Sequence, residues 1–142
     1  MRIALQQAGN ARTADEVPIG AVVVLDGRVI GQGFNQPILS HDPTAHAEVV
    51  ALRAAANSVG NYRLTNATMY VTVEPCLMCV GAMVHARIAT VVFGATEPKS
   101  GALLSMTRAH ELPGLNHRME IIEGVLAADS RALLQEFFKA RR

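Results

Sequence analysis

The stretch that decides the fold is MYVTVEPCLMCVGAMVHARIATVVFGA, residues 69–95. It opens with an apolar run typical of a buried strand, continues from Pro75 with a helix-forming segment, and ends in a second strand-like run. Upstream, residues 19–35 predict two strands joined at Asp26-Gly27, a dipeptide that favours a hairpin turn. Because strands alternate with helices, we predict an α/β fold with helices on both faces of one sheet, which the hairpin makes mixed.

The remaining elements and the composition are compatible with one compact domain over residues 1–142. We expect a helix over 2–14, a helix beginning at Pro43 and Thr44, a strand in 119–125 and a closing helix in 126–142. The net charge of +1 provides no overall attraction for nucleic acid, although it allows a local basic patch. No apolar run is long enough to cross a membrane, and the first residues lack a secretory signal, so we expect a cytoplasmic protein.

The only two cysteines, Cys76 and Cys79, lie three positions apart at the start of a predicted helix. In a cytosolic chain such a pair is more typical of metal ligands or a redox couple than of a structural bridge. Positions i and i+3 share one helix face, so both sulfurs can bind one ion. A catalytic zinc has three protein ligands and one open position. His46, at another predicted helix start, is the best placed third ligand; the competitors are His41, His85, His110 and His117.

Glu48 follows His46 by two positions, and the two residues can approach one ion only from the first turn of a helix. Both motifs therefore predict an ion held between two helix N-termini, whose positive ends favour thiolates. A structural zinc site needs no spare carboxylate, whereas a hydrolytic site needs a group that moves protons. The combined pattern H-x-E…P-C-x-x-C is the known signature of zinc-dependent deaminases.

Further segments carry a more specific resemblance across nearly the whole chain. They are EVPIGAVVV, the GFN of residues 33–35, HDPTAHAE, NYRL, YVTVEPCLMC, GAMVHARI, VVFGA, GLNHR and the terminal FFKARR. On these segments the chain resembles the bacterial tRNA-specific adenosine deaminases of the cytidine-deaminase-like superfamily. The zinc motifs alone specify only the superfamily, whereas HDPTAHAE, GLNHR and FF-x-x-RR are more specific. Glu97 departs from the pattern, because the family typically has aspartate in this loop.

The resemblance implies a mixed five-stranded sheet sandwiched by helices, a homodimer with one Zn²⁺ per subunit, and conversion of adenosine to inosine at the wobble position of tRNA. It implies His46, Cys76 and Cys79 as the zinc ligands and Glu48 as the catalytic residue that moves protons. It also implies contacts with the substrate. Asn35 would bind the base, Val17 and Val73 would form apolar walls with the His46 ring, and the flanking anticodon loop would contact Phe138, Lys99, Arg141 and Arg142.

The residues taken one by one leave simpler interpretations open. Glu48 is also explained as a first-turn acid, Asn35 as a turn residue, and Phe138 as part of a core stripe. Two other functions stay open as well. One is a deaminase of a free base or nucleoside, such as cytosine, guanine or cytidine. The other is a closed zinc module without activity, in which His41 or His110 supplies a fourth ligand.

Overall fold

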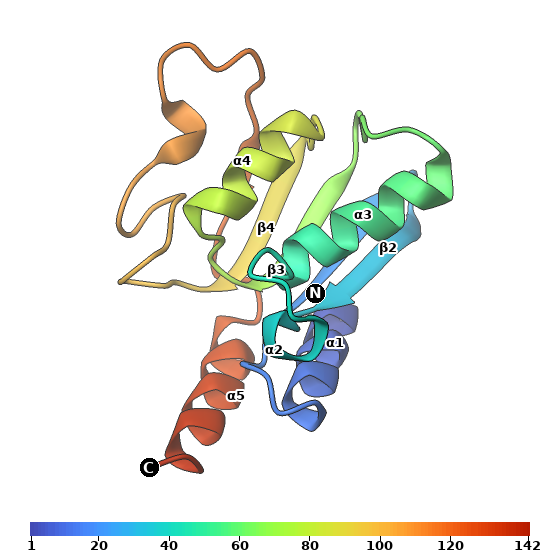
Figure 1. The fold of residues 1–142 in the computed structure, drawn as a ribbon. Helices are drawn as coiled ribbons and strands as arrows, with labels where there is room; N and C mark the ends of the chain where they lie inside the picture. The colour runs from blue at the N-terminus through green and yellow to red at the C-terminus, as the bar shows by residue number, and fades with distance from the viewer.

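In the computed structural model, which describes residues 1–142, one sheet lies between two layers of helices (Figure 1). The strands are β1 (Gly20–Leu25), β2 (Arg28–Phe34), β3 (Thr68–Val73), β4 (Thr90–Ala95) and β5 (Glu120–Ile122). The helices are α1 (Arg2–Thr13), α2 (Pro37–Ser40), α3 (Ala47–Val59), α4 (Leu77–His85) and α5 (Ala127–Lys139), with a 3₁₀ turn η1 (Ala109–Glu111). The predicted three-layer fold with a mixed five-stranded sheet is confirmed.

The sheet has the strand order β2-β1-β3-β4-β5. β1 is antiparallel to both β2 and β3, whereas β3, β4 and β5 are mutually parallel. The hairpin turns at Asp26 and Gly27, which have φ angles of 51° and 74°. Two positive φ angles in succession suit the right-handed twist of the flanking strands. The hairpin is therefore the feature that makes the sheet mixed, as predicted.

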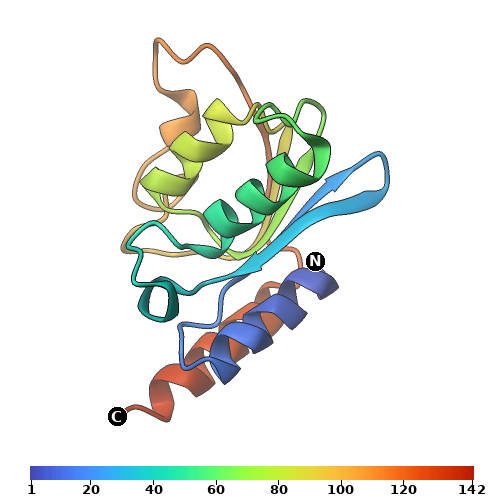
Figure 2. The ribbon, with the colours of Figure 1, turned by 45° about the vertical axis from the view of Figure 1, so that its right-hand side comes forward.

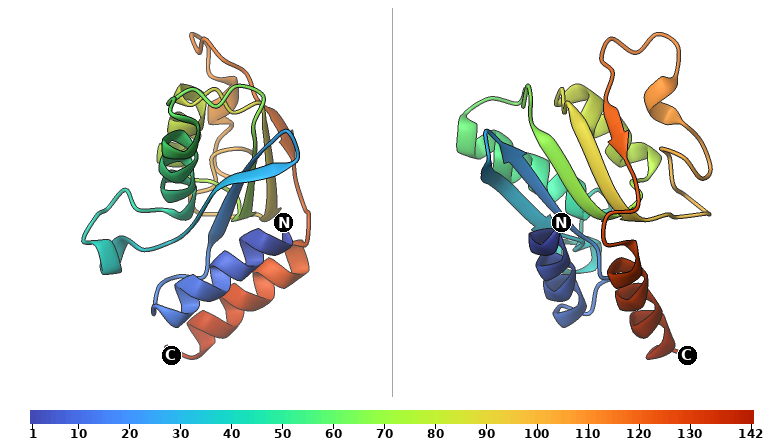
Figure 3. Two further views of the ribbon diagram at one scale, coloured as in Figure 1. Left: turned by 90° about the vertical axis from the view of Figure 1, so that its right-hand side faces the viewer. Right: turned by 180° about the vertical axis from the view of Figure 1, so that it is seen from behind.

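The two faces of the sheet carry different helices (Figures 2 and 3). α3 and α4 cover one face, and α1 and α5 lie side by side on the other. α3 packs closely on β2, because a Cβ atom added to Gly31 would come within 2.5 Å of the Ala51 carbonyl oxygen. A cluster of 23 buried residues, including Phe93 and Met69, joins the sheet to α3 and α4. None of the helices has both the length and the apolar character needed to cross a bilayer.

The two helices on one face of the sheet, α3 and α4, begin later than the sequence predicts. α3 begins at Ala47 rather than at Pro43 and Thr44, because the Asp42 carboxylate accepts both the backbone N–H and the hydroxyl of Thr44 and forms a local turn. His46 is thus the extended N-cap residue of α3. α4 begins at Leu77, and Cys76 is its extended N-cap residue. Two of the three expected metal ligands, His46 and Cys76, therefore stand at the tips of helices.

Candidate active site

The first turns of α3 and α4 bring three ligand atoms together. The Nδ1 atom of His46 lies 3.5 Å from the Sγ atom of Cys76 and 3.6 Å from that of Cys79, and the two sulfurs are 3.7 Å apart. For a tetrahedral zinc site with ordinary bond lengths, the sulfur–sulfur distance is about 3.8 Å and the sulfur–nitrogen distance about 3.6 Å. The three donors are therefore already spaced for one tetrahedral ion.

Without a metal, the two sulfurs share one proton. Their mutual hydrogen bond lowers the pKa of Cys76 to about 4, with a further contribution from His46. The same hydrogen bond, together with burial, raises the pKa of the Cys79 thiol. The bond to Cys76 also raises the pKa of His46. A divalent cation at this point would displace the shared proton, because metal ligands bind in their deprotonated form.

The other four histidines lie apart from this group. His41 is the exposed C-cap residue of α2, and His85 ends α4 beside a surface groove. His110 is buried in η1, and the Nε2 atom of His117 lies 2.6 Å from the Ile88 carbonyl oxygen. Neither His41 nor His110 belongs to the group of possible ligands, so the protein offers three donors there. A tetrahedral ion held by them would have one position left for a non-protein ligand.

Glu48, in the first turn of α3, is buried next to the three donors, with only 4% of its surface exposed. Burial raises the pKa of Glu48 to about 7, and the charge of the Cys76 thiolate adds to the rise. A carboxyl group that titrates near neutral pH can both accept and donate a proton there. Its surroundings therefore suit a general acid and base.

A cavity of about 180 Å³ opens in front of these groups. Six of the residues singled out in the sequence line it: His46, Glu48, Cys76, Asn35, Val17 and Val73. Asn35 is buried, and its backbone N–H donates to the Ile19 carbonyl oxygen, which fixes the chain at this wall. The structure thus gathers two of the three donor residues, one carboxyl group, one amide and two valines around a single cavity.

The four residues expected to contact flanking RNA lie outside the cavity. Lys99 belongs to the adjacent loop, where its backbone N–H donates to the carboxylate of Glu97. Phe138 and Arg142 line a separate surface pocket at the end of α5. The guanidinium group of Arg141 stacks 3.4 Å above the Phe137 ring and pairs with Asp15 at the end of α1. Arg141 therefore also ties α5 to α1.

Sequence reasoning missed Glu74, which lines the same cavity and is only 3% exposed. It follows the strand run MYVTV directly and precedes Pro75. An acidic residue at the end of a buried apolar run was the available signal, because charged side chains are almost never fully buried without partners.

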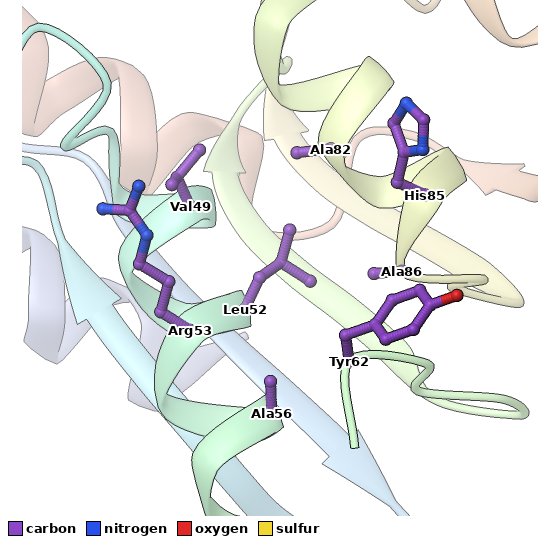
Figure 4. Close-up of a pocket in the computed structure, with 8 residues that line it drawn as sticks. All are labelled: Val49, Leu52, Arg53, Ala56, Tyr62, Ala82, His85 and Ala86. Atoms are coloured by element: carbon purple, nitrogen blue, oxygen red, sulfur yellow. The ribbon is translucent and has the colours of Figure 1, made fainter. Parts of the chain in front are cut away.

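A second concave surface lies between α3 and α4, away from the donors (Figure 4). Its walls are mainly apolar, with Val49 and Leu52 from α3 and Ala82 from α4, and Tyr62 and His85 stand at one end. It contains none of the residues of the cavity described above. We treat it as a surface distinct from the candidate active site.

The comparisons with known proteins identify the class of protein first. Residues 1–142 match the MafB19-like deaminases, and the chain belongs to this family. It is 48% identical to the tRNA-specific adenosine deaminase of Haemophilus influenzae over 143 residues, which cover 100% of this chain and 83% of that protein. It is 43% identical to the tRNA-specific adenosine deaminase of Agrobacterium fabrum, with coverages of 100% and 93%.

A solved structure supports the same placement. It is a tRNA:A34 deaminase, studied for A-to-I editing at the wobble position of transfer RNA, with a TM-score of 0.92 and 43% identity over 94% of this chain and 97% of that one. Within the deaminases, the chain therefore belongs to the family of tRNA-specific adenosine deaminases, and the resemblance predicted from the sequence is confirmed.

Proposed function

We propose that residues 1–142 form a single zinc-dependent deaminase domain that converts adenosine to inosine at the wobble position of tRNA. The observation that carries the proposal is the spacing of the His46, Cys76 and Cys79 donors beside the buried Glu48 carboxyl group. The full-length similarity to tRNA-specific adenosine deaminases supports the choice of substrate. Because that substrate is tRNA, we place the reaction in the cytoplasm.

Zinc suits the donor set, since two thiolates and one imidazole favour zinc over harder cations such as Mg²⁺ or Ca²⁺. His46, Cys76 and Cys79 would hold one ion per chain. When bound, zinc supplies a Lewis acid that activates water at neutral pH. Cys79 is completely buried, so it contributes to the site from the protein interior, and His46 and Cys76 form the boundary with the cavity.

Glu48 would move the protons of the reaction. It takes one proton from the attacking water and delivers it to a ring nitrogen of adenine as the water oxygen bonds to the ring carbon that bears the amino group. It then takes the second proton from that oxygen and passes it to the amino group, so that the carbon–nitrogen bond breaks, ammonia leaves and a carbonyl group forms. The second transfer is needed because ammonia leaves poorly unless it is protonated. The burial of Glu48 and its place two residues after His46 support both transfers, since Glu48 and His46 line the same cavity.

The cavity walls would hold the base. The side-chain amide of Asn35 offers both a donor and an acceptor to the edge of adenine, and Val17 and Val73 with the His46 ring exclude water from its faces. An unpaired base in an anticodon loop needs little energy to turn into such a cavity. A single small cavity that encloses one base therefore suits a single-stranded loop better than a duplex.

The flanking nucleotides of the anticodon loop would contact residues outside the cavity. We assign Lys99, Phe138 and Arg142 to this surface, with Phe138 as a stacking platform that is 48% exposed. Arg141 joins them by exchanging its exposed Asp15 partner for a phosphate. These contacts would extend recognition beyond the base itself.

A homodimer would cover the groove between α3 and α4. Leu77 and Met78 of α4 are 55% and 37% exposed, so they extend the apolar surface of this layer, and a two-fold contact would bury it on both copies at once. We expect Ala82→Arg, which puts a charge into the groove, to give monomers in analytical ultracentrifugation. Ala132→Arg, on the exposed side of α5, should leave a dimer. A monomeric unmodified protein would contradict this assignment.

The test of substrate uses purified protein with a set of transcribed tRNAs beside free adenosine, cytidine, guanine and cytosine. We expect inosine at the first anticodon position of tRNA and a rate that falls steeply as salt rises, because phosphate contacts release counterions. Comparable turnover of a free base or nucleoside, nearly indifferent to salt, would favour the alternative deaminase.

The test of the metal is elemental analysis of the same preparation. We expect about one zinc per chain, as in other catalytic zinc sites, and its loss in Cys79→Ala. Because metal binding adds to the free energy of folding, this variant should also unfold more easily. Fully active protein without a tightly bound transition metal would contradict the proposal.

A further inference from the structure

Glu74 stands where the sheet meets the candidate active site. It follows β3 directly and lies two residues before Cys76. Its backbone N–H donates to the Ala95 carbonyl oxygen at 2.8 Å, which holds this position against the end of β4. The side chain is buried and lines the cavity. Glu74 is therefore fixed at its backbone and lies in the wall of the cavity.

The carboxylate accepts hydrogen bonds from both ends of the loop formed by residues 97–105. Its Oε2 atom accepts the backbone N–H groups of Leu103, Leu104 and Ser105 at 3.2, 2.9 and 2.9 Å. Its Oε1 atom accepts the N–H of Glu97 at 3.2 Å and the hydroxyl of Ser105. Although burial opposes it, these bonds lower the pKa of Glu74, so the carboxylate stays charged.

The same loop forms one wall of the cavity. Glu97 and Ser100 line the cavity, and Lys99 lies between them. The loop contains no helix or strand, so its own backbone leaves the N–H groups of residues 103–105 to the carboxylate. Gly101 lies close against the carboxylate, because an added Cβ atom would lie 2.4 Å from the carboxyl carbon of Glu74. Apart from the bond between the Ala102 N–H and the Pro75 carbonyl oxygen and the burial of Ala102 and Leu103, the Glu74 side chain is thus the main polar anchor of this wall.

We propose that Glu74 is a positioning residue: its carboxylate fixes the loop of residues 97–105 against the cavity and so sets how tightly the RNA loop binds, without taking part in the chemistry. The inference rests on the proposed function, because the wall matters only if a substrate occupies the cavity. A glutamine cannot replace the carboxylate, since it offers one acceptor oxygen and turns its NH₂ group toward N–H donors.

The test compares three variants on an RNA stem–loop with adenosine at the first anticodon position. We expect Glu74→Gln to raise KM at least about tenfold, because donors to a charged acceptor are left unpaired, while kcat changes less than about threefold. Ser105→Ala, which removes one donor, should raise KM about threefold. Glu123→Gln, in the exposed turn after β5, is the matched control and should leave both constants unchanged. Zinc content should stay equal in all of them.

Hydrogen exchange gives a readout apart from activity. The amides of Leu103, Leu104 and Ser105 should exchange faster in Glu74→Gln than in the unmodified protein, while the amides of α3 keep their protection. Unchanged exchange would overturn the proposal. If Glu74→Gln does not fold, Ser105→Ala decides by the same two measurements.

The kinetic outcomes separate this inference from the proposed function. An unmodified protein that leaves the RNA intact would remove the proposed function, and the exchange of the loop amides would still test what Glu74 holds. An active protein whose Glu74→Gln variant keeps its KM would overturn the inference alone. A loss confined to kcat would also overturn it, because Glu74 would then act in the chemistry.

Discussion

Two buried carboxyl groups face the same cavity and have opposite properties. Glu48 lies two residues after His46 and Glu74 two residues before Cys76, and their exposed fractions are 4% and 3%. Burial raises the pKa of Glu48 to about 7, whereas at Glu74 burial is outweighed by the hydrogen bonds of the loop, which lower its pKa. Low surface exposure alone therefore does not determine the pKa of a carboxyl group, because nearby charges and hydrogen-bond donors also contribute.

The difference separates two kinds of work at one site. A carboxyl group with few donors changes its protonation near neutral pH and can carry protons. A carboxylate with donors on both oxygens keeps its charge and holds a segment of backbone in place. The roles proposed for Glu48 and Glu74 follow this difference, proton transfer for the first and positioning for the second, and each assignment can be tested against the other.

The largest expected effect is on catalysis at Glu48. Glu48→Gln keeps the shape of the side chain but cannot carry a proton, so we expect kcat to fall about 10³-fold. Zinc content should be unchanged, because Glu48 is not one of the three donors. Single-turnover kinetics with elemental analysis provide both values. An unchanged kcat would contradict the proposed proton transfer by Glu48, and the two carboxyl groups would then not differ in catalytic role.

The pH dependence of stability should run in opposite directions for the two groups in metal-free protein. The pKa of Glu48 is raised from 4.5 to about 7, so its contribution is fully present below pH 4.5 and is lost as the pH rises through 7. The loss is roughly 3 kcal/mol, and Glu48→Gln should abolish it. The pKa of Glu74 is lowered, so its contribution is present above pH 4.5 and is lost as the pH falls.

Urea unfolding after chelation, measured from pH 4 to pH 8, checks these two windows. Glu74→Gln should flatten only the acid side of the curve, and Glu48→Gln only the neutral side. Curves that move together in both variants would show that the two carboxyl groups are not independent.

At constant pH the two glutamine variants should also differ in stability. Glu74→Gln leaves several buried N–H groups without an acceptor, and we expect the free energy of unfolding to fall by about 2 kcal/mol. Glu48 has no such set of donors, so Glu48→Gln should change the free energy of unfolding by less than about 1 kcal/mol. Denaturant unfolding of zinc-loaded protein at pH 7 measures both stability changes. A larger loss of stability in Glu48→Gln than in Glu74→Gln would contradict the proposed roles.

The smallest effect is expected for an exposed carboxylate used as a reference. Glu136 on α5 pairs with Arg12 on α1 at 2.8 Å, and its side chain is 59% exposed. We expect Glu136→Gln to change the free energy of unfolding by less than about 0.5 kcal/mol, because exposed ion pairs are screened by water. Thermal unfolding with a parallel activity assay checks this. A larger effect would mean that burial is not what separates Glu48 and Glu74 from other carboxylates.

The sequence predicts the fold, and it predicts that His46, Cys76 and Cys79 lie together, because helix starts and turns depend on local spacing. The Asp26-Gly27 turn fixes the hairpin, and the alternation of strands with helices fixes the layers. The separation of Cys76 and Cys79 by three positions places both sulfurs at one helix tip. The start of α3 was predicted too early, because the turn between Asp42 and Thr44 competes with the first helical turn.

The role of Glu74 could not be predicted, because its partners lie 23 to 31 residues further along the chain. The same holds for the end of α5, where Arg141 pairs with Asp15 across 126 residues. Contacts between residues so far apart in the sequence are set by how the helices and strands pack together in the folded protein, and local sequence spacing does not reveal them. Periodicity therefore locates α5 but does not identify what its last residues contact.

The layer formed by α1 and α5 has a consequence for the order of folding. The two helices are neighbours on one face of the sheet, although residues that pair across them, such as Arg12 and Glu136, are 124 positions apart in the sequence. Until α5 docks, the apolar strands beneath it and the site for the buried Phe137 are open to water. Because contacts between distant parts of a chain form slowly, a partly folded chain without α5 in place exposes an apolar surface through which it can aggregate.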